Sequence, residues 1–217
     1  MTTDLAAEAA RRVEDARLDG CDELDLSRLR LTSLPPALAE LTALSELNLS
    51  DNWLSEIPDW LGELTGLTTL RLDGNRLTAL PDSLAALTGL TRLDLNDNRF
   101  ATVPEWIGDL TGLTTLYLYG NRLAVLPNTL TRLTGLTRLN LGFNRLASVP
   151  EWLTECPDLT ELYLDFNRLS GVPDWLGGLT ELSSLGISDC QLTELPEWLA
   201  GLRGLSVLYL DGNQLAA

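Results

Sequence analysis

The chain repeats one apolar pattern every 23 residues, without insertion or deletion. The unit from Leu67 to Gly89 reads LxxLxLxxNxLxxLPxxLxxLxx. Successive units open with leucines at one shared position: Leu44, Leu67, Leu90, Leu113, Leu136, Leu159, Leu182 and Leu205. A fixed period of roughly 20 to 50 residues is typical of solenoids, in which each unit buries its apolar face only against its neighbours. The pattern therefore predicts one continuous array of stacked units.

Each unit divides into a strand half and a turn half. Around Leu70 and Leu72 apolar and polar residues alternate, which is the period of a strand with one buried face. One such strand per unit predicts a parallel sheet of eight or nine strands. After Pro81 the apolar residues lie three apart, a spacing that suits a short 3₁₀ or α turn on a convex side. The fold class is thus an α/β solenoid with a concave parallel sheet and short convex turns.

An asparagine follows the strand half of most units, as Asn75 does after Leu72. We expect its buried amide to bond the backbone groups of the turn that a strand would otherwise have paired. The same position holds Asn52, Asn98, Asn121, Asn144, Asn167 and Asn213. The first unit has Leu29 there and the eighth has Cys190, so we expect the turn at Cys190 to be weaker.

The chain divides into residues 1–20, an N-terminal capping helix, and residues 21–217, an array of eight full repeats and a partial ninth. We expect Thr3 to cap the helix and Gly20 to end it. An apolar stripe on this helix, able to cover the first repeat, is formed by Leu5, Ala9, Val13 and Ala16. A helix that recruits a partner is the alternative. The last unit stops at Ala217 without its convex half, so we expect its apolar end either to stay open or to be covered, for example by end-to-end pairing.

The charge and composition exclude several classes of function. The net charge is −16, which argues against nucleic acid or an anionic membrane as the partner. All 15 basic residues are Arg, and the chain has neither Lys nor His. It therefore lacks a phosphate-loop lysine, a Schiff base, a histidine-based triad and imidazole metal ligands. We predict no cofactor and no metal.

The three cysteines, Cys21, Cys156 and Cys190, occupy different positions of the repeat, and we expect all three to be buried as small apolar residues. Their odd number and lack of a close pair argue against a disulfide framework and favour a reducing compartment. The N-terminus has no signal-like apolar segment, and no apolar run reaches membrane-spanning length. We therefore expect a cytoplasmic protein.

Over residues 21–215 the frame LxxLxLxxNxLxxLPxxLxxLxx resembles intracellular leucine-rich repeat proteins of the Ras-suppressor type, and the repeat regions of bacterial Roco proteins and secreted effectors. The resemblance implies a curved horseshoe that binds a protein or peptide on its concave sheet. It does not imply catalysis, because the catalytic parts of such proteins lie outside the repeats. Roco proteins add a GTPase, and the effectors that are ubiquitin ligases add a separate domain. The sequence contains no GxxxxGK[ST] loop, so the resemblance implies a non-catalytic binding module.

Aromatic residues gather at the outward positions of the central strands. Six of the seven Tyr and Phe residues lie there: Tyr117, Tyr119, Phe143, Tyr163, Phe166 and Tyr209. Aromatic neighbours can simply stabilise a sheet, but the outer strands carry polar residues instead. Exposed Tyr and Phe beside Arg and Asp are typical of interface hot spots. We predict that these six aromatics bind the partner, together with Arg92, Asp94 and Arg138.

Two further columns have a structural and a functional interpretation. One arginine per turn recurs as Arg76, Arg99, Arg122, Arg145 and Arg168. These arginines could form an exposed ion-pair ladder with nearby aspartates, or could bind an acidic segment or a phosphate. Five of the six tryptophans share one convex position: Trp60, Trp106, Trp152, Trp175 and Trp198. These tryptophans could pack on one another and on the side-chain stems of their acidic neighbours, or they could form a binding strip.

Two other classes of function remain. An enzyme would have to use carboxylates such as Asp94 and Asp97, with Tyr117 as proton donor, but open strand positions do not desolvate such groups. A structural protein that associates through its C-terminal end is the main alternative to the binding module.

Overall fold

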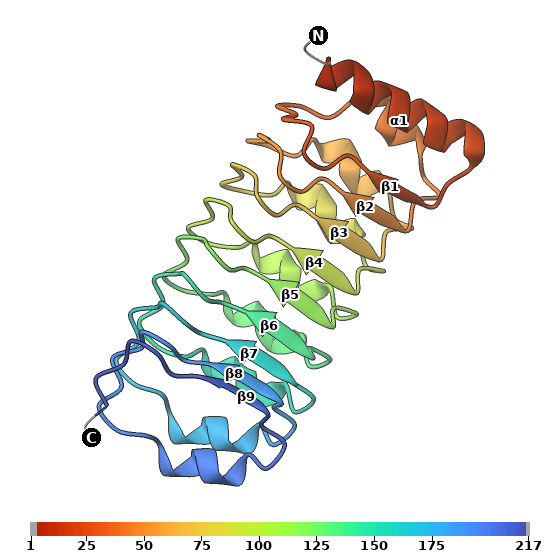
Figure 1. Cartoon of the computed structure of the whole chain (residues 1–217). Coiled ribbons are helices and arrows are strands. Elements are labelled where there is room, and N and C mark those ends of the chain that lie inside the picture. Colours follow the sequence, from red (N-terminus) through yellow and green to blue (C-terminus); the bar gives the residue numbers. More distant parts are fainter. Residues whose placement is uncertain (1–3, 216–217) are drawn as a thin grey trace.

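In the computed structural model, which describes residues 4–215, nine strands form one parallel sheet in sequence order (Figure 1). They are β1 (Glu23–Asp25), β2 (Glu46–Asn48), β3 (Thr69–Arg71), β4 (Arg92–Asp94), β5 (Thr115–Tyr117), β6 (Arg138–Asn140), β7 (Glu161–Tyr163), β8 (Ser184–Gly186) and β9 (Val207–Tyr209). Neighbouring strands pair at a constant offset of 23 residues, so that Leu47 faces Leu70 and Leu70 faces Leu93. The sequence period is therefore the register of the sheet.

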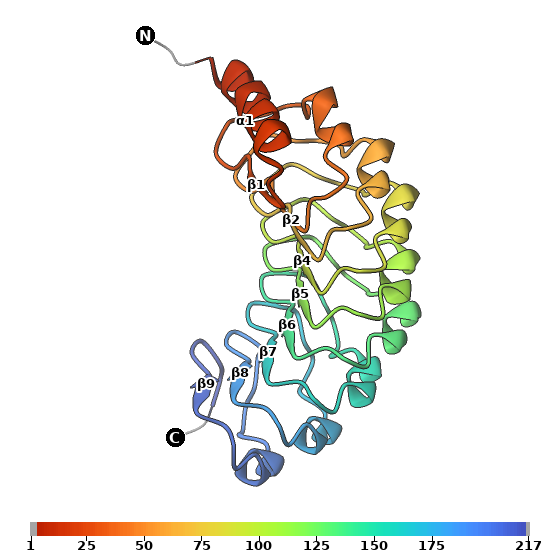
Figure 2. The same ribbon diagram turned by 90° about the vertical axis from the view of Figure 1, so that its right-hand side faces the viewer.

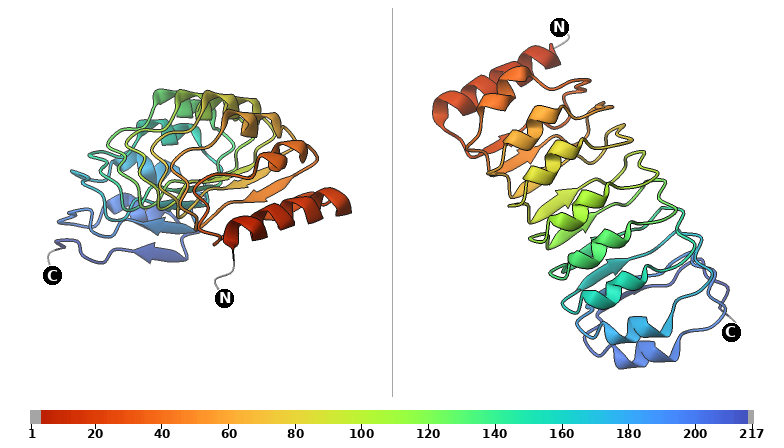
Figure 3. Two further views of the ribbon diagram at one scale, coloured as in Figure 1. Left: turned by 90° about the horizontal axis from the view of Figure 1, so that it is seen from above. Right: turned by 180° about the vertical axis from the view of Figure 1, so that it is seen from behind.

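The outer side of the curve carries eight 3₁₀ helices within the described range (Figures 2 and 3). They are η1 (Pro36–Glu40), η2 (Asp59–Glu63), η3 (Asp82–Ala86), η4 (Glu105–Asp109), η5 (Asn128–Arg132), η6 (Glu151–Glu155), η7 (Asp174–Gly178) and η8 (Glu197–Gly201). A proline precedes or opens each helix, as Pro81 does before η3. Proline fixes φ and lacks an N–H, so it suits a position that begins a turn. The predicted horseshoe with a concave sheet and short convex turns is confirmed.

The leucines of both halves form one core between the sheet and the 3₁₀ helices. Leu70 and Leu72 of the strand half and Leu84 of the turn half are at most 1% exposed. Because a single repeat cannot enclose these side chains, each repeat depends on the two beside it.

The buried asparagines hold the turns. Asn121 donates from Nδ2 to the carbonyl oxygens of Leu95 (2.9 Å), Leu118 (3.1 Å) and Tyr119 (3.2 Å). Its Oδ1 accepts from the N–H of Phe100 in the preceding repeat, at 3.0 Å. One side chain therefore bonds its own turn and the neighbouring one. At Cys190 the thiol makes only long contacts, 3.5 Å to the Leu164 carbonyl and 3.3 Å to that of Ser188.

Helix α1 (Leu5–Asp19) lies over the first repeat (Figure 1). Ala9, Val13 and Ala16 of the predicted stripe are buried, and Arg12 donates to the carbonyl oxygen of Asp25 at 3.0 Å. Gly20 ends the helix with φ +63, as expected. The predicted cap Thr3 lies outside the described residues, and Asp4 is the cap, accepting from the N–H of Ala7 at 3.2 Å.

One expectation about buried side chains is wrong. Cys156 and Cys190 are buried, but Cys21 is exposed, because it leads out of α1 and has no preceding repeat beneath it. The tryptophans do not form ring pairs with one another among residues 4–215. Trp152 is 7% exposed, and the other four pack partly buried against the core. Burial on this scale favours the structural interpretation of the tryptophan column.

The asparagine bonds generate a stability prediction. Asn121→Ala should lower the free energy of unfolding by about 1–3 kcal/mol, because the turn loses its partners away from water. Asn121→Cys should cost less, since Cys190 already occupies this position in the eighth repeat. Urea denaturation measures both. Equal midpoints for the wild type and Asn121→Ala would contradict this role of the amide.

Candidate protein-binding surface

The predicted site residues all lie on the concave side, but on two kinds of backbone. Strand residues are Arg92 and Asp94 in β4, Tyr117 in β5, Arg138 in β6, Tyr163 in β7 and Tyr209 in β9. Turn residues, a few positions beyond a strand, are Tyr119, Phe143 and Phe166. The sheet therefore brings the predicted residues onto one face, yet divides them into smaller groups.

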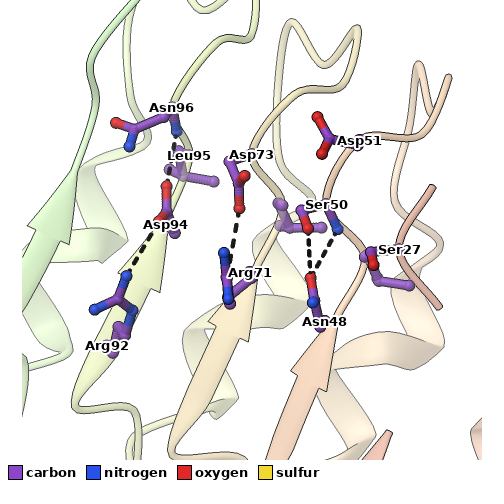
Figure 4. Close-up of polar contacts among 12 residues, drawn as sticks. Ser27, Asn48, Ser50, Asp51, Arg71, Asp73, Arg92, Asp94, Leu95 and Asn96 are labelled. Carbon is purple, nitrogen blue, oxygen red and sulfur yellow. Dashed lines mark hydrogen bonds and ion pairs between the residues drawn. The ribbon is translucent and has the colours of Figure 1, made fainter. Parts of the chain in front are cut away.

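The N-terminal half of the face is polar and internally paired (Figure 4). Arg71 lies 3.7 Å from Asp73, and Arg92 lies 3.4 Å from Asp94. Asn48 accepts from the hydroxyl of Ser50 at 2.6 Å. These contacts lie within single repeats, so each pair fixes the side chains of one strand and its turn.

Asp94 is only 4% exposed, so its carboxylate has little surface to offer a partner. It accepts from the N–H of Asn96 at 3.2 Å and holds Arg92. Arg92 in turn lies over the Tyr117 ring, with its guanidinium carbon 4.8 Å from the ring centroid. Asp94 thus positions an arginine and, through it, a tyrosine ring.

Arg138 is also paired within the protein, since its Nε donates to Oε1 of Glu161 at 2.8 Å. Both arginines of the predicted site, Arg92 and Arg138, therefore already have acidic partners within the protein. A partner protein would have to compete with these contacts or bind beside them.

Three of the aromatics form a contiguous group, which we call the aromatic cluster: Tyr119, Phe143 and Phe166. The Tyr119 and Phe143 ring centroids are 5.3 Å apart, and those of Phe143 and Phe166 are 4.3 Å apart. Phe143 is nevertheless 47% exposed and Phe166 44% exposed. Stacking on each other covers only part of each ring, and the rest faces solvent.

Tyr163 and Tyr209 form a separate pair, with ring centroids 6.3 Å apart. They belong to strands two positions apart, and Gly186 of β8 lies between them. A Cβ atom at Gly186 would lie 2.0 Å from an Asp165 carboxylate oxygen. The missing side chain therefore leaves room for Asp165 to lean across β8, where it accepts from the N–H of Ser188 at 2.8 Å.

The two phenylalanines have an unusual backbone. Phe143 has φ +52 and Phe166 has φ +54, in the left-handed region. We call this frame position the turn row, and its other members are Arg28, Asp51, Gly74, Asp97, Gly120, Asp189 and Gly212, all with positive φ. Glycine and aspartate suit this region, whereas a bulky aromatic residue there is strained. Sequence analysis missed this strain, although the Asp and Gly residues at the same position of other repeats signal it.

Gly142, which has no side chain, leaves room for the Tyr119 ring of the aromatic cluster. A Cβ atom at Gly142 would lie 3.1 Å from Cδ2 of Tyr119. The Tyr119 ring therefore leans across the backbone of the next repeat, toward Phe143. A side chain at Gly142 would push the ring away by a few tenths of an ångström.

Several carboxylates on this face are partly desolvated. Burial raises the pKa values of Asp73, Asp94, Asp97 and Asp165 above the ordinary range. The charge of Asp73 adds to the rise in the Asp94 pKa, and bonds or charges from Asn96, Arg92 and Arg71 oppose it. Burial also raises the pKa of Tyr119, with Asp97 and Asp165 adding to the effect.

The two buried thiols are little ionised at neutral pH. Burial raises the pKa of the Cys156 thiol to about 11 and that of Cys190 to about 12. No group of three or more Cys, Asp or Glu residues within 4–215 is arranged to hold a metal ion. In the same part of the chain, no helix is long and apolar enough to cross a membrane.

Comparison with known proteins assigns the family. The family model described as "Leucine rich repeat" matches residues 21–77, 65–123, 124–169 and 157–215. The chain therefore belongs to the leucine-rich repeat family, whose members are typically protein-interaction modules without catalytic activity. No curated protein matches the sequence.

Solved structures of bacterial repeat proteins share the fold. A leucine-rich repeat protein of Leptospira interrogans is 29% identical, with a TM-score of 0.82 over 97% of this chain and 58% of its own. YopM, a leucine-rich effector protein from Yersinia pestis, is 30% identical, with a TM-score of 0.78 over 98% of this chain and 56% of its own. An internalin of Listeria monocytogenes is 23% identical, with a TM-score of 0.73 over 99% of this chain and 70% of its own. This chain thus spans little more than half the length of the first two.

The raised carboxylate pKa values predict how stability depends on pH. A carboxyl group whose pKa is higher in the folded than in the unfolded state binds its proton more tightly when folded. The stabilisation from this group is fully present below its pKa in the unfolded state, near 3.8. It is lost as the pH rises through the pKa of the folded state. The urea midpoint should therefore rise as the pH is lowered from about 7 through the folded-state pKa values of these carboxyl groups toward 3.8.

Asp94→Asn should raise the midpoint at pH 7 and reduce its pH dependence, because it removes a charge that is costly to bury. Asp82→Asn, on the exposed side of η3, makes the same change in net charge and serves as the control. A midpoint that falls steadily as the pH is lowered from about 7 toward 3.8, with Asp94→Asn unchanged from the wild type, would contradict the assignment.

Proposed function

We propose that the protein is a non-catalytic module that binds a protein or peptide through the aromatic cluster of its concave face. One observation carries the proposal: two adjacent phenylalanines, Phe143 and Phe166, are exposed, stacked 4.3 Å apart and held at positive φ. Residues in sparsely populated backbone regions persist where the surrounding structure fixes them, and they gather at binding sites.

The strain separates the two interpretations of the aromatics. If Phe143 and Phe166 served only to stabilise the sheet, Gly or Asp at the same position would do so with less strain. Six of the other seven repeats use these smaller residues, as at Asp97 and Gly120, and the first repeat has Arg28. The retention of two large apolar side chains at this position therefore supports a role outside the fold.

The surroundings of the cluster suit a rigid hot spot. Backbone bonds fix both residues: the N–H of Phe143 donates to the Asp165 carbonyl at 2.8 Å, and that of Phe166 to the Ser188 carbonyl at 2.9 Å. Aromatic side chains offer a large contact area and have few rotatable bonds to immobilise. Binding at this site would require little ordering of the protein.

The charges beside the cluster indicate the partner's chemistry. Arg28, Arg71, Arg92 and Arg138 on the sheet and turn row are each within 3.7 Å of an acidic oxygen. Near the cluster, Asp97, Asp165 and Asp189 make no ion pair within residues 4–215. On the sheet and the turn row, the charges left unpaired near the cluster are thus acidic. We therefore expect the segment seated on the cluster itself to combine apolar anchors with basic residues, which can also lie over the aromatic faces.

Self-association through the last strand is the second candidate. Leu208 and Tyr209 of β9 are 37% and 48% exposed, and β9 pairs only with β8 among the described residues. Sedimentation velocity at several concentrations tests this directly. A constant monomer mass would contradict it. The free thiols of Cys21, Cys156 and Cys190 support the further proposal of a reducing compartment such as the cytoplasm.

The binding proposal predicts that the double variant Phe143→Gly with Phe166→Gly weakens partner affinity by more than about 2 kcal/mol, or roughly 30-fold. The partner is captured from the source cell with immobilised wild-type protein, and the affinity of the purified partner is then measured by calorimetry.

The control is Leu18→Ala with Leu195→Ala, which removes two exposed apolar side chains, 69% and 53% exposed, away from the cluster. This variant should bind like the wild type. If the glycine variant keeps its affinity while the control loses it, the aromatic cluster is not the binding site.

A further inference from the structure

A second column of side chains runs beside the aromatic cluster and is not explained by the fold. We call it the arginine strip: Arg76, Arg99, Arg122, Arg145 and Arg168. Each member stands two residues beyond the turn row, as Arg145 does after Phe143. Its backbone N–H donates to a carbonyl of the preceding repeat at 2.8–2.9 Å, for example from Arg122 to Phe100. These bonds fix the backbone at each strip position, so the strip presents one arginine per repeat.

The side chains of the strip have no acidic partner. The ion-pair ladder considered in the sequence analysis is wrong, because none of the five guanidinium groups makes an ion pair or hydrogen bond within residues 4–215. Eight other arginines do form ion pairs: Arg11, Arg12, Arg17, Arg28, Arg71, Arg92, Arg132 and Arg138. The contrast is marked in a chain with 31 acidic residues.

The residues next to the strip are small and uncharged. Each strip arginine is followed directly by a buried Leu or Phe and then by two further positions before the next apolar residue of the frame. In these five repeats the two positions are Thr78, Ala79, Ala101, Thr102, Ala124, Val125, Ala147, Ser148, Ser170 and Gly171. Acids stand there only in the repeats on either side, as Glu56 and Glu194. Val125 is 66% exposed. A groove of about 450 Å³ borders this surface. It includes Ala124, Val125 and Ser148, and Glu151 and Glu155 of η6 also line it. The positions directly beside the strip thus carry no charge.

The ends of the strip are also defined. In the second repeat Trp53 takes the arginine position, and Arg30 and Arg76 lie over its ring, 5.6 and 5.0 Å from the centroid. In the eighth and ninth repeats Gln191 and Gln214 take the position. With strands about 4.8 Å apart, five consecutive arginines span about 19 Å.

We propose that the arginine strip binds an extended acidic segment of a protein. Five guanidinium groups in line, none with an acidic partner, repel one another, and carboxylates laid along them would relieve this repulsion through charge-assisted, two-pronged hydrogen bonds. The strip is one side chain wide, which fits a single extended chain. Nucleic acid is disfavoured, because a long polyanion would also meet the remaining charge of a protein at −16.

The probe is a peptide of ten glutamates, which when extended is about 33 Å long and can span the strip. Binding is followed by NMR of the arginine Nε–Hε signals at about 0.1 M salt, where charges are screened beyond about 10 Å. The signals of the five strip arginines should shift with the peptide, and those of Arg132 and Arg203 should not.

The test variant is Arg122→Gln with Arg145→Gln, which should weaken peptide binding at least tenfold. Glutamine already occupies this position at Gln191 and Gln214, so the substitution suits the fold. The matched control, Arg132→Gln with Arg203→Gln, removes the same charge from exposed positions off the strip and should change the affinity less than twofold. The variant Phe143→Gly with Phe166→Gly should bind the peptide like the wild type, because the two surfaces are distinct.

Three results would overturn the proposal. One is the absence of peptide binding, and another is equal binding by the strip variant and the control. The third is tighter binding of a ten-nucleotide thymidine oligomer than of the peptide, which would make the strip a nucleic-acid site.

Discussion

The buried asparagine amide is the interaction on which the rest of the structure depends. A strand of three residues cannot hold a repeat in place, and the turn after it leaves carbonyl oxygens without strand partners. Asn121 donates to two of them, those of Leu95 and Leu118, and to the Tyr119 carbonyl, which also accepts from the N–H of Asp97. Its Oδ1 accepts from an N–H of the preceding repeat. This asparagine recurs every 23 residues except at Leu29 and Cys190. In both exceptions the next residue, Arg30 or Gln191, also has positive φ, so the turn changes shape when the amide is missing.

Because buried groups define the turn, the outward positions are free to vary. The concave face uses this freedom in two ways. Its N-terminal half pairs charges within repeats, as between Arg92 and Asp94. Its centre instead carries the strained and exposed rings of Phe143 and Phe166. A rigid turn can hold a residue that is unfavourable for the turn itself. A repeat protein can therefore carry a binding site while its repeating apolar pattern stays the same.

The sequence was enough to predict what repeats, and much less of what does not. The 23-residue period predicted the parallel register, and Gly20 and Val13 predicted the end and the buried side of α1. The pattern could not predict that Asp94 is buried or that Arg122 has no acidic partner, since both depend on side-chain conformations across neighbouring repeats. Cys21 was misjudged because a first repeat lacks the neighbour that buries the equivalent Leu44.

The central claim is that Phe143 and Phe166 are kept for binding at some expense in stability. Replacing each with all other amino acids and measuring stability by resistance to proteolysis tests it most directly. The account predicts that Gly, Asn and Asp, which tolerate positive φ, give proteins at least as stable as the wild type at both positions. If Phe proves the most stable residue at either position, the rings are part of the fold, and the account of the concave site is contradicted.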